Sequence, residues 1–303
     1  MKIAITGASG QLGRAAVEGL AERVGMANLI LISRDPSRLA EFAERGASCR
    51  RGDFDDPASL TDAFAGADRM LLISGTRVGK RVAQHRAAIE AAVASGVGHI
   101  AYTSFIGISA DNPAIIVRDH GPTEDILKSS GAAWTILRDA QYADAVTDVI
   151  APNALATGKW VSSSGDGRMA FVARDDCVAC AVAVLAGQGH EGRTYNVTGP
   201  ELLTYRQAAQ IVAEAGGRPV DYVATDDNGL YAMFDAMGVP REPVDDLVVG
   251  GNPWCSDDMV TFEAGIRGGH FDVLTDDVER LTGRGPRSLR DLARARLGLQ
   301  AAK

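Results

Sequence analysis

The chain has 303 residues, of which 46% are hydrophobic and 23% charged, and its formal net charge is −8. No run of about eighteen apolar residues occurs that would predict a membrane span. The acidic net charge argues against a nucleic-acid binder, which would normally have a basic face. The arginines of RGPRSLRDLARAR recur at helical spacing, so this basic segment indicates the solvated face of an amphipathic helix. The opening MKIAIT runs directly into a glycine loop, so we expect a cytoplasmic protein without a signal peptide.

Apolar strand patterns and helical patterns alternate regularly through residues 1–138. The strand patterns are KIAIT, NLILIS, SCRRGD, RMLLIS, HIAYTS and WTILR, and helical patterns lie at 11–24, 57–66 and 80–96. Such alternation predicts βαβ units, with helices on both faces of a parallel sheet. We therefore expect an α/β fold with a doubly wound parallel sheet of the Rossmann type, in which residues 1–138 form the dinucleotide-binding domain.

Beyond residue 138 the alternation fades. Helical patterns lie at 174–187, 204–215, 275–282 and 287–297, RTYNVTG and RPVDYVA are typical of strands, and residues 238–258 show no clear period. The pattern predicts a smaller, partly helical substrate-side region, 139–303, with some elements returning to the Rossmann sheet.

Three glycines follow the first strand and open a helix. They form the sequence Gly7-x-x-Gly10-x-x-Gly13. Gly7 would permit a tight turn, Gly10 would let the backbone approach a pyrophosphate, and Gly13 would let the helix pack closely on the strand. The free N–H groups of the helix N-terminus would then face the phosphates. A tight turn without a ligand is the alternative, but the βαβ context favours a dinucleotide.

The end of the second strand predicts which dinucleotide binds. An enzyme that prefers NAD usually has an acidic residue here, whereas this chain has Ser33 and Arg34, with Arg38 one turn later. A guanidinium suits the 2′-phosphate of NADP(H). Alternatively, Arg34 only faces solvent and Asp35 caps the next helix.

Two further strand ends carry residues that suit a dinucleotide. Asp53 follows the third strand and could accept from the adenine amino group, while the ring of Phe54 could pack on the base. Ser74 and Gly75 follow the fourth strand, where doubly wound sheets bind ligands.

Cys177 and Cys180 form a C-x-x-C pattern within a helix rich in Ala and Val. A zinc site would need a second pair of ligands at suitable spacing, and the sequence shows none. We expect two buried structural thiols and no metal.

The glycine spacing, preceded by Thr6, resembles that of the short-chain dehydrogenase/reductase superfamily. Within it the chain is similar to the NmrA-like atypical reductases, and among those to bacterial NADPH-dependent quinone reductases and triphenylmethane reductases. The resemblance extends over nearly the whole chain, in TGASGQLG, SRDPSR, GDFDDPASL, LLISG, HIAYTS, DHGPTE, LRDAQY, RTYNVTGPELLTYRQAA and VERLTGRGPRSLRDLA.

The resemblance implies functional residues at positions that match the family pattern. The dinucleotide would be lined by Gly7, Ser9, Gly10, Gln11, Leu12, Gly13, Ser33, Arg34, Asp53, Phe54, Ser74, Gly75 and Thr103. His120 and Tyr142, the candidate catalytic residues, would border the nicotinamide and the substrate together with residues near Phe105. The chain departs from the family at Asp139, where Asn is usual, so the substrate could differ.

The expected Tyr-x-x-x-Lys pair of ordinary short-chain dehydrogenases is absent after the fifth strand, where Tyr102 is followed by Ile106. His120 stands near the position of the missing pair. Pro122 favours a helix that begins there, which would place His120 just outside its N-terminus, where the dipole disfavours imidazolium. His120 is therefore either a neutral hydrogen-bonding group at the substrate or only a local helix-start residue.

Together these features predict an NADPH-dependent reductase. Its partner would be a small aromatic or conjugated molecule, such as a quinone, that accepts hydride without a strong general acid. An NADP(H)-dependent ketone reductase or alcohol dehydrogenase, and a dinucleotide-sensing regulator without turnover, are the alternatives. A homodimer is compatible with the sequence.

Overall fold

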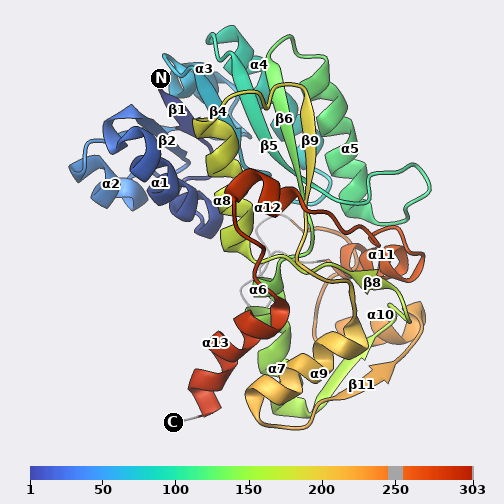
Figure 1. Ribbon diagram of the computed structural model, residues 1–303. Helices are drawn as coiled ribbons and strands as arrows, with labels where there is room; N and C mark the ends of the chain where they lie inside the picture. Colours follow the sequence, from blue (N-terminus) through green and yellow to red (C-terminus); the bar gives the residue numbers. More distant parts are fainter. Residues whose placement is uncertain (245–254, 302–303) are drawn as a thin grey trace.

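A parallel sheet of seven strands forms the centre of the protein (Figure 1). The structure is a computed structural model, and it describes residues 1–244 and 255–301. In the order β3-β2-β1-β4-β5-β6-β9, the strands are Ser48–Arg51, Leu29–Ser33, Ile3–Ile5, Arg69–Leu72, His99–Phe105, Ala133–Asp139 and Arg193–Val197. All neighbours are parallel. The order reverses between β1 and β4, which creates the switch point at which such sheets bind ligands. The predicted Rossmann-type sheet is confirmed.

Successive side chains of the strands point to opposite faces of the sheet and build two cores. Ile3 and Ile5 belong to one core and Ala4 to the other, as period-two strands require. The first core includes residues of α1 Gln11–Val24 and α8 Arg174–Ala186. The second includes residues of α3 Ala58–Phe64, α4 Arg81–Ala94 and α5 Ile115–Lys128. Short elements η1 Met26–Asn28, η2 Pro36–Leu39 and α2 Ala40–Glu44 flank β2.

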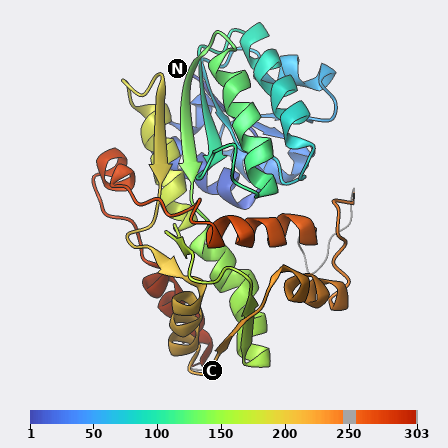
Figure 2. The same ribbon diagram turned by 90° about the vertical axis from the view of Figure 1, so that its right-hand side faces the viewer.

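A smaller lobe lies beyond the carboxyl edge of the sheet (Figures 1 and 2). Its strands pair as β7 Lys159–Ser162 with β11 Asp221–Ala224 in parallel and as β8 Arg168–Met169 with β10 Leu203–Thr204 in antiparallel orientation. Its helices are α6 Ala143–Ala145, the π-helix η3 Val146–Ile150, α7 Ala151–Thr157, α9 Tyr205–Gly216, α10 Asp227–Ala236, α11 Ser256–Arg267 and α13 Leu289–Ala301. The helix α12 Asp277–Thr282 instead packs against α8 and β9 of the Rossmann sheet.

The four helices expected in the second half correspond to α8, α9, α12 and α13. The sequence pattern does not indicate α10, because the start of this helix, DDNG, has the composition of a turn. In the structure Asp226 instead caps this helix by accepting from the N–H of Gly229 at 2.8 Å. The unpatterned segment 238–258 includes the start of α11, and its residues 245–254 lie outside the described part of the chain.

The strand β9 joins the second half of the chain to the Rossmann sheet by pairing with β6. The helix α8 likewise packs against α1 on one face of that sheet. Both elements follow residue 138, so a domain boundary at that residue stays a proposal.

The expected start of the helix around His120 is wrong. The helix α5 begins at Ile115, so His120 lies within it and Pro122 is an interior residue. A proline cannot donate to the carbonyl four residues earlier, which here belongs to Arg118. Because Arg118 and Pro122 are both exposed, water can satisfy that carbonyl, and the helix continues.

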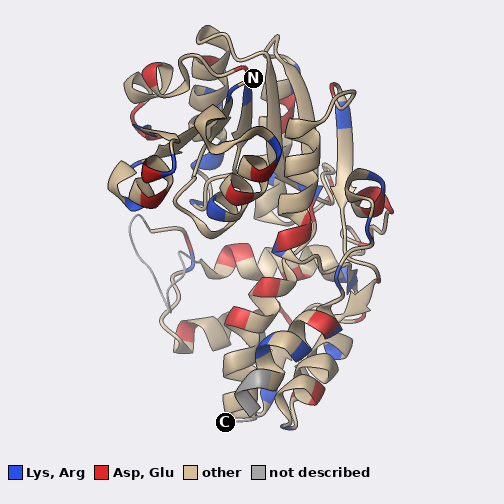
Figure 3. Ribbon diagram, turned by 60° about the vertical axis from the view of Figure 1, so that its left-hand side comes forward, with Lys and Arg blue, Asp and Glu red and all other residues tan. Residues whose placement is uncertain are grey.

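Acidic and basic residues are interspersed over the helices, with no continuous basic stripe in the view of Figure 3. The C-terminal arginines form ion pairs within the chain, such as Arg284 with Asp176 and Arg296 with Asp144. The arginines of the segment 284–296, which we expected to face solvent, are therefore partly held in ion pairs. Among the residues that the structure describes, no helix is long and apolar enough to cross a membrane.

Candidate functional site

The loops that leave the carboxyl ends of β1 to β6 carry the residues that the sequence singled out. Parallel strands bring these ends to one edge of the sheet. The edge holds the glycine loop after β1, Ser33 and Arg34 at the end of β2, Asp53 and Phe54 after β3, Ser74 and Gly75 after β4, Thr103 in β5, and Asp139 at the end of β6.

The glycine loop has the geometry of a phosphate cradle. Gly7 has a φ of 61°, which side chains disfavour, and the N–H of Gly10 donates to its carbonyl at 2.9 Å. A Cβ atom on Gly13 would lie 2.2 Å from the same carbonyl, so α1 can approach the strand only because residue 13 is glycine. No side chain caps α1, and its first turn contains no acidic residue. The N-terminus of the helix is therefore suited to a pyrophosphate.

The end of β2 presents a basic side chain to solvent. Ser33 is buried, and its hydroxyl lies 3.0 Å from that of Ser9. Arg34 is exposed and has no ion pair with any described residue. Asp35 caps η2 by accepting from the N–H of Ser37 at 3.0 Å. Asp35 thus caps the next helix, as one of the two interpretations of this segment predicted. Arg34 stays available to a phosphate.

Threonine hydroxyls connect the strand ends at the switch point. Thr6 donates to the carbonyl of Leu71 at 3.2 Å and accepts from the N–H of Ile73 at 2.9 Å. Thr103 accepts from the N–H of Ser74 at 2.9 Å. These bonds hold the loop after β4 beside the glycine loop and leave the Thr103 hydroxyl committed to the backbone.

His120 is 3% exposed and lies against the aromatic residues of β5. Its Nδ1 atom is 2.7 Å from the hydroxyl of Tyr102, and the two rings are stacked with centroids 5.7 Å apart. The ring of Phe105, at the end of β5, lies 6.3 Å away on another side. Burial lowers the pKa of His120 well below its usual value, assisted by the positive charge of Arg81. The imidazole is therefore neutral, although the cause is burial and not a helix N-terminus.

A second histidine, His85, packs against the ring of Tyr102, with the ring centroids 5.4 Å apart. His85 in α4 accepts from the N–H of Gly75 through Nε2 at 3.0 Å, and its Nδ1 is 3.2 Å from the hydroxyl of Thr123. Burial, with help from Arg81, lowers the pKa of His85 to about 3. This residue is therefore neutral as well.

A buried ion pair between Arg81 and Asp119 lies next to these two histidines. The guanidinium of Arg81 donates to Asp119 at 3.0 Å and to the carbonyl of Gly75 at 2.6 Å. Asp119 also accepts from the N–H of Gly79 at 3.0 Å. These bonds attach the loop after β4 to α5, so loss of either charged partner would leave the other buried and unpaired.

Asp139 and Tyr142 form a second polar pair. The Tyr142 hydroxyl donates to Oδ2 of Asp139 at 3.0 Å, while Oδ1 of Asp139 is enclosed without a partner. Burial raises the pKa of Asp139 to about 7, although the hydrogen bond from Tyr142 opposes the shift. The register pairs Asp139 with Phe105, so this residue adjoins the same strand end as His120. Among the described residues, neither a hydrogen bond nor a ring contact joins His120 to Tyr142.

Phenylalanines from the small lobe cover the end of β5. The rings of Phe262 and Phe271 lie 5.7 and 5.8 Å from that of Phe105, and 5.0 Å from each other. A Cβ atom on Gly107 would come within 2.6 Å of Phe271, so the backbone after β5 approaches this cluster closely. The cluster provides an apolar aromatic wall beside His120.

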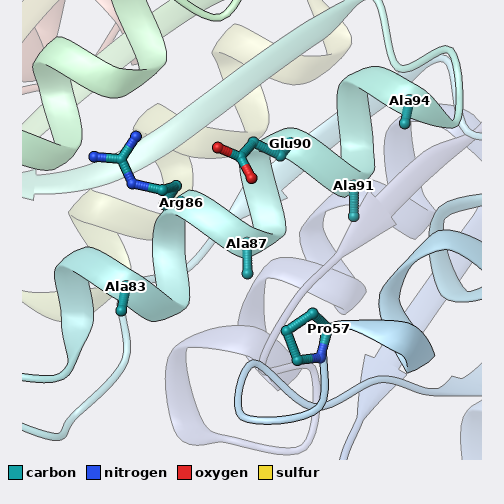
Figure 4. A pocket seen from close by; sticks show the side chains of 7 residues that line it. All are labelled: Pro57, Ala83, Arg86, Ala87, Glu90, Ala91 and Ala94. Carbon is teal, nitrogen blue, oxygen red and sulfur yellow. The ribbon is translucent and has the colours of Figure 1, made fainter.

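A surface depression lies elsewhere, on the outer side of α4 (Figure 4). It has a volume of about 480 Å³ and is lined by Pro57, Ala83, Arg86, Ala87, Glu90, Ala91 and Ala94. None of the strand-end residues described above contributes to it. The site is therefore located by its backbone geometry and not by this depression.

Comparison with known proteins gives the family. Residues 7–188 match the family described as NAD(P)H-binding. The chain belongs to the NAD(P)H-binding family. Within it, the chain is 37% identical over 238 residues to quinone oxidoreductase 2 of Escherichia coli, covering 78% of this chain and 82% of the relative. It is 28% identical over 301 residues to the NAD(P)H azoreductase of Xenophilus azovorans, covering 97% of each.

Solved structures of other family members have the same fold. The NADPH complex of the Escherichia coli NADPH-dependent quinone oxidoreductase superposes with a TM-score of 0.86 at 32% identity, covering 96% of this chain and 98% of that one. The Citrobacter sp. triphenylmethane reductase complexed with NADP(H) gives a TM-score of 0.83 at 28% identity, covering 99% and 100%.

These matches confirm the resemblance to NmrA-like reductases, the assignment as an NAD(P)H-dependent oxidoreductase and the nicotinamide cofactor. The structure brings the predicted cofactor residues to one edge of the sheet. The individual roles of those residues and of His120 and Tyr142 stay proposals.

Several residues of the site carry no functional signal in the sequence motifs: Arg81, His85, Tyr102, Asp119 and Thr123. Each is polar and almost completely buried. Tyr102 lies where a Tyr-x-x-x-Lys motif could begin, but Ile106 stands in place of the lysine. A tyrosine within the strand HIAYTS was the available signal, since buried tyrosines usually have a hydrogen-bond partner.

Proposed function

We propose that this protein is an NADPH-dependent reductase that transfers a hydride to a quinone or a related conjugated, electron-poor acceptor. The observation that carries the proposal is the neutral, buried His120 beside Phe105, whose ring also contacts those of Phe262 and Phe271. A neutral imidazole is a hydrogen-bond donor but a weak acid. Such a site suits an acceptor whose reduced form is a delocalised anion that takes its proton from water.

The dinucleotide is assigned to the cradle by its shape and charge. The close approach at Gly13 and the acid-free first turn of α1 fit a pyrophosphate. When bound, NADPH supplies the hydride for the reaction. Arg34 would bind its 2′-phosphate, and the loop of Ser74 and Gly75, held by Thr103, would line the nicotinamide side.

The family members named above support the acceptor class. Their names specify quinones, azo compounds and triphenylmethane dyes, all of which are conjugated and electron-poor. For this chain, Asp139 in place of the usual Asn changes one polar contact near the end of β5, so its preferred acceptor need not match theirs.

A panel of acceptors tests the proposal. Purified protein would be mixed with NADPH or NADH and with quinones, an azo dye, a triphenylmethane dye and simple ketones, and oxidation of the cofactor would be followed. We expect turnover with conjugated acceptors and little with simple ketones. Preferential reduction of ketones would instead identify an alcohol dehydrogenase, and cofactor binding without turnover would identify a regulator.

A further inference from the structure

We propose that Tyr102 and His85 are positioning residues that hold His120 as a single neutral tautomer, with its proton on Nε2, and that this N–H donates to the acceptor. The inference rests on the proposed function and deepens it. It follows from the directions in which the hydrogen bonds of one buried chain must run.

The chain of bonds begins at a backbone group whose role is fixed. The N–H of Gly75 can only donate, so Nε2 of His85, 3.0 Å away, must accept. A neutral imidazole with an accepting Nε2 carries its proton on Nδ1. His85 is neutral because burial lowers its pKa to about 3.

The proton of His85 then fixes the neighbouring hydroxyl groups. Thr123 donates its own proton to the carbonyl of Asp119 at 2.8 Å, so its oxygen is free to accept from Nδ1 of His85 at 3.2 Å. Tyr102 lies 3.4 Å from the same nitrogen and cannot donate to it, because that nitrogen is itself a donor.

The Tyr102 hydroxyl therefore donates to Nδ1 of His120, at 2.7 Å. Since Nδ1 accepts, the proton of the neutral His120 ring lies on Nε2. This Nε2 has no hydrogen-bond partner among the described residues, and it is not among the fully enclosed polar atoms that lack one. Its N–H is thus available to a bound molecule.

Charged groups around the network favour the neutral state. Arg81 in α4 lies near enough to lower the pKa of both histidines. The acidic groups of α5 have other partners, since Asp119 pairs with Arg81 and Glu124 pairs with Arg138. From α11, Asp258 faces the Arg81–Asp119 pair.

A fixed neutral donor suits the reduction of a quinone. Addition of hydride to a ring carbon moves negative charge onto a carbonyl oxygen. A preorganised N–H directed at that oxygen stabilises the developing charge without transferring its proton, which water supplies afterwards. If Nε2 were instead the unprotonated nitrogen, it would repel this oxygen.

Nitrogen NMR tests the tautomer without any turnover. In a ¹⁵N–¹H correlation spectrum of histidine-labelled wild-type protein, assigned by comparison with His120→Gln, we expect Nδ1 of His120 to be unprotonated and Nε2 protonated. Tyr102→Phe should give a mixture of tautomers. A wild-type ring protonated on Nδ1, or a Tyr102→Phe spectrum unchanged at His120, would overturn the inference.

Two isosteric variants test the donor itself. The side-chain amide of Gln places an N–H near the position of Nε2, whereas that of Asn reaches only the position of Nδ1. We expect His120→Asn to reduce quinone turnover by about tenfold more than His120→Gln, because only the latter keeps a donor facing the substrate. Equal losses in the two variants would exclude a donor role for Nε2.

A matched tyrosine provides the control. Tyr195 in β9 also shares a hydrogen bond with a histidine, His190, at 3.0 Å, but that histidine precedes the strand and lies at the amino edge of the sheet. Tyr102→Phe should lower kcat about tenfold with the KM for NADPH unchanged. Tyr195→Phe should leave both unchanged. Similar kcat values in the two variants would show that the Tyr102 hydroxyl is only structural.

A binding experiment separates this inference from the proposed function. With NADP⁺ bound, a naphthoquinone cannot be reduced, and it should shift the Nε2 proton resonance of His120. If the tautomer is as inferred but no acceptor shifts this resonance or is reduced, the proposed function fails while the tautomer assignment stands. If quinones are reduced without any shift, the role of His120 fails alone.

Discussion

The hydroxyl of Tyr142 donates to Oδ2 of Asp139 at 3.0 Å, and the other oxygen of this carboxyl group is sealed in the interior without a partner. The resemblance to NmrA-like reductases implies an amide at this position. An amide would accept from Tyr142 equally well and would not have to be desolvated as a charge. The acidic side chain therefore makes the stability of this protein depend on pH.

Asp139→Asn should stabilise the protein at alkaline pH. The pKa of Asp139 is about 7 in the folded protein against 3.8 for a free aspartate, so unfolding releases a proton between these values. Stability contributed by this group is present below about pH 4 and is lost as the pH rises to about 7. Because one pKa unit corresponds to about 1.4 kcal/mol, the variant should gain up to about 4 kcal/mol at pH 8 and little near pH 4.

Urea unfolding of the apoprotein across this pH range measures the gain. Asp166→Asn, at an exposed position, is the matched control. A gain from Asp139→Asn that does not change with pH would show that the carboxyl group is not protonated in the folded state.

Arg34→Ala should weaken the binding of NADPH by about ten- to a hundred-fold, since a charged hydrogen bond to the 2′-phosphate contributes about 1.5–3 kcal/mol. NADH lacks this phosphate, so its affinity should change little. Fluorescence titration with both cofactors measures the effect, and Arg23→Ala, another exposed arginine, controls for the general loss of charge. Equal affinity of the wild-type protein for NADH and NADPH would contradict the assignment.

His120→Ala should lower kcat/KM for a quinone by about five- to a hundred-fold, with NADPH affinity largely kept. Loss of a single hydrogen bond in the transition state explains this size, whereas loss of an obligatory general acid could reach about ten-thousand-fold. Steady-state kinetics and a cofactor titration separate the two. An active-site role is excluded if the variant retains full activity, and a drop beyond about a thousand-fold would indicate a ketone reductase.

The activity should show no titration of His120 between about pH 6 and pH 8. Burial lowers the pKa of this histidine well below 6.5, so the ring is neutral throughout this range. A profile of kcat/KM against pH for the wild-type protein checks the expectation. An inflection in this range that disappears in His120→Gln would mean that the charged imidazolium takes part.

The double variant Cys177→Ala, Cys180→Ala should keep its turnover and lose some stability. Both thiols are buried in α8, and no group of three or more possible metal ligands occurs among the described residues. Metal analysis of purified wild-type protein should find no stoichiometric zinc. A folded double variant that lacks activity would show that the thiols have more than a structural role, for which the electrostatic influence of Cys177 on the carboxyl group of Asp139 is the candidate route.

Local patterns in the sequence were sufficient for the seven strands of the parallel sheet, for most helices and for the phosphate cradle, but not for β7, β8 and β10 of the small lobe. Strand and helix periods depend on neighbouring residues, and the roles of Gly7 and Gly13 follow from a turn and a close approach within one βα unit. Arg34 could be singled out in the same way, because the end of the second strand is defined by its own apolar run.

Only the tertiary structure decided the state of His120. Its helix continues through Pro122 because the carbonyl that the proline cannot bond lies on the exposed face, which no local signal shows. Its hydrogen-bond partner Tyr102 comes from β5, and His85 comes from α4. The burial that keeps both histidines neutral arises only when these elements pack together, because desolvation depends on neighbours that are distant in the sequence.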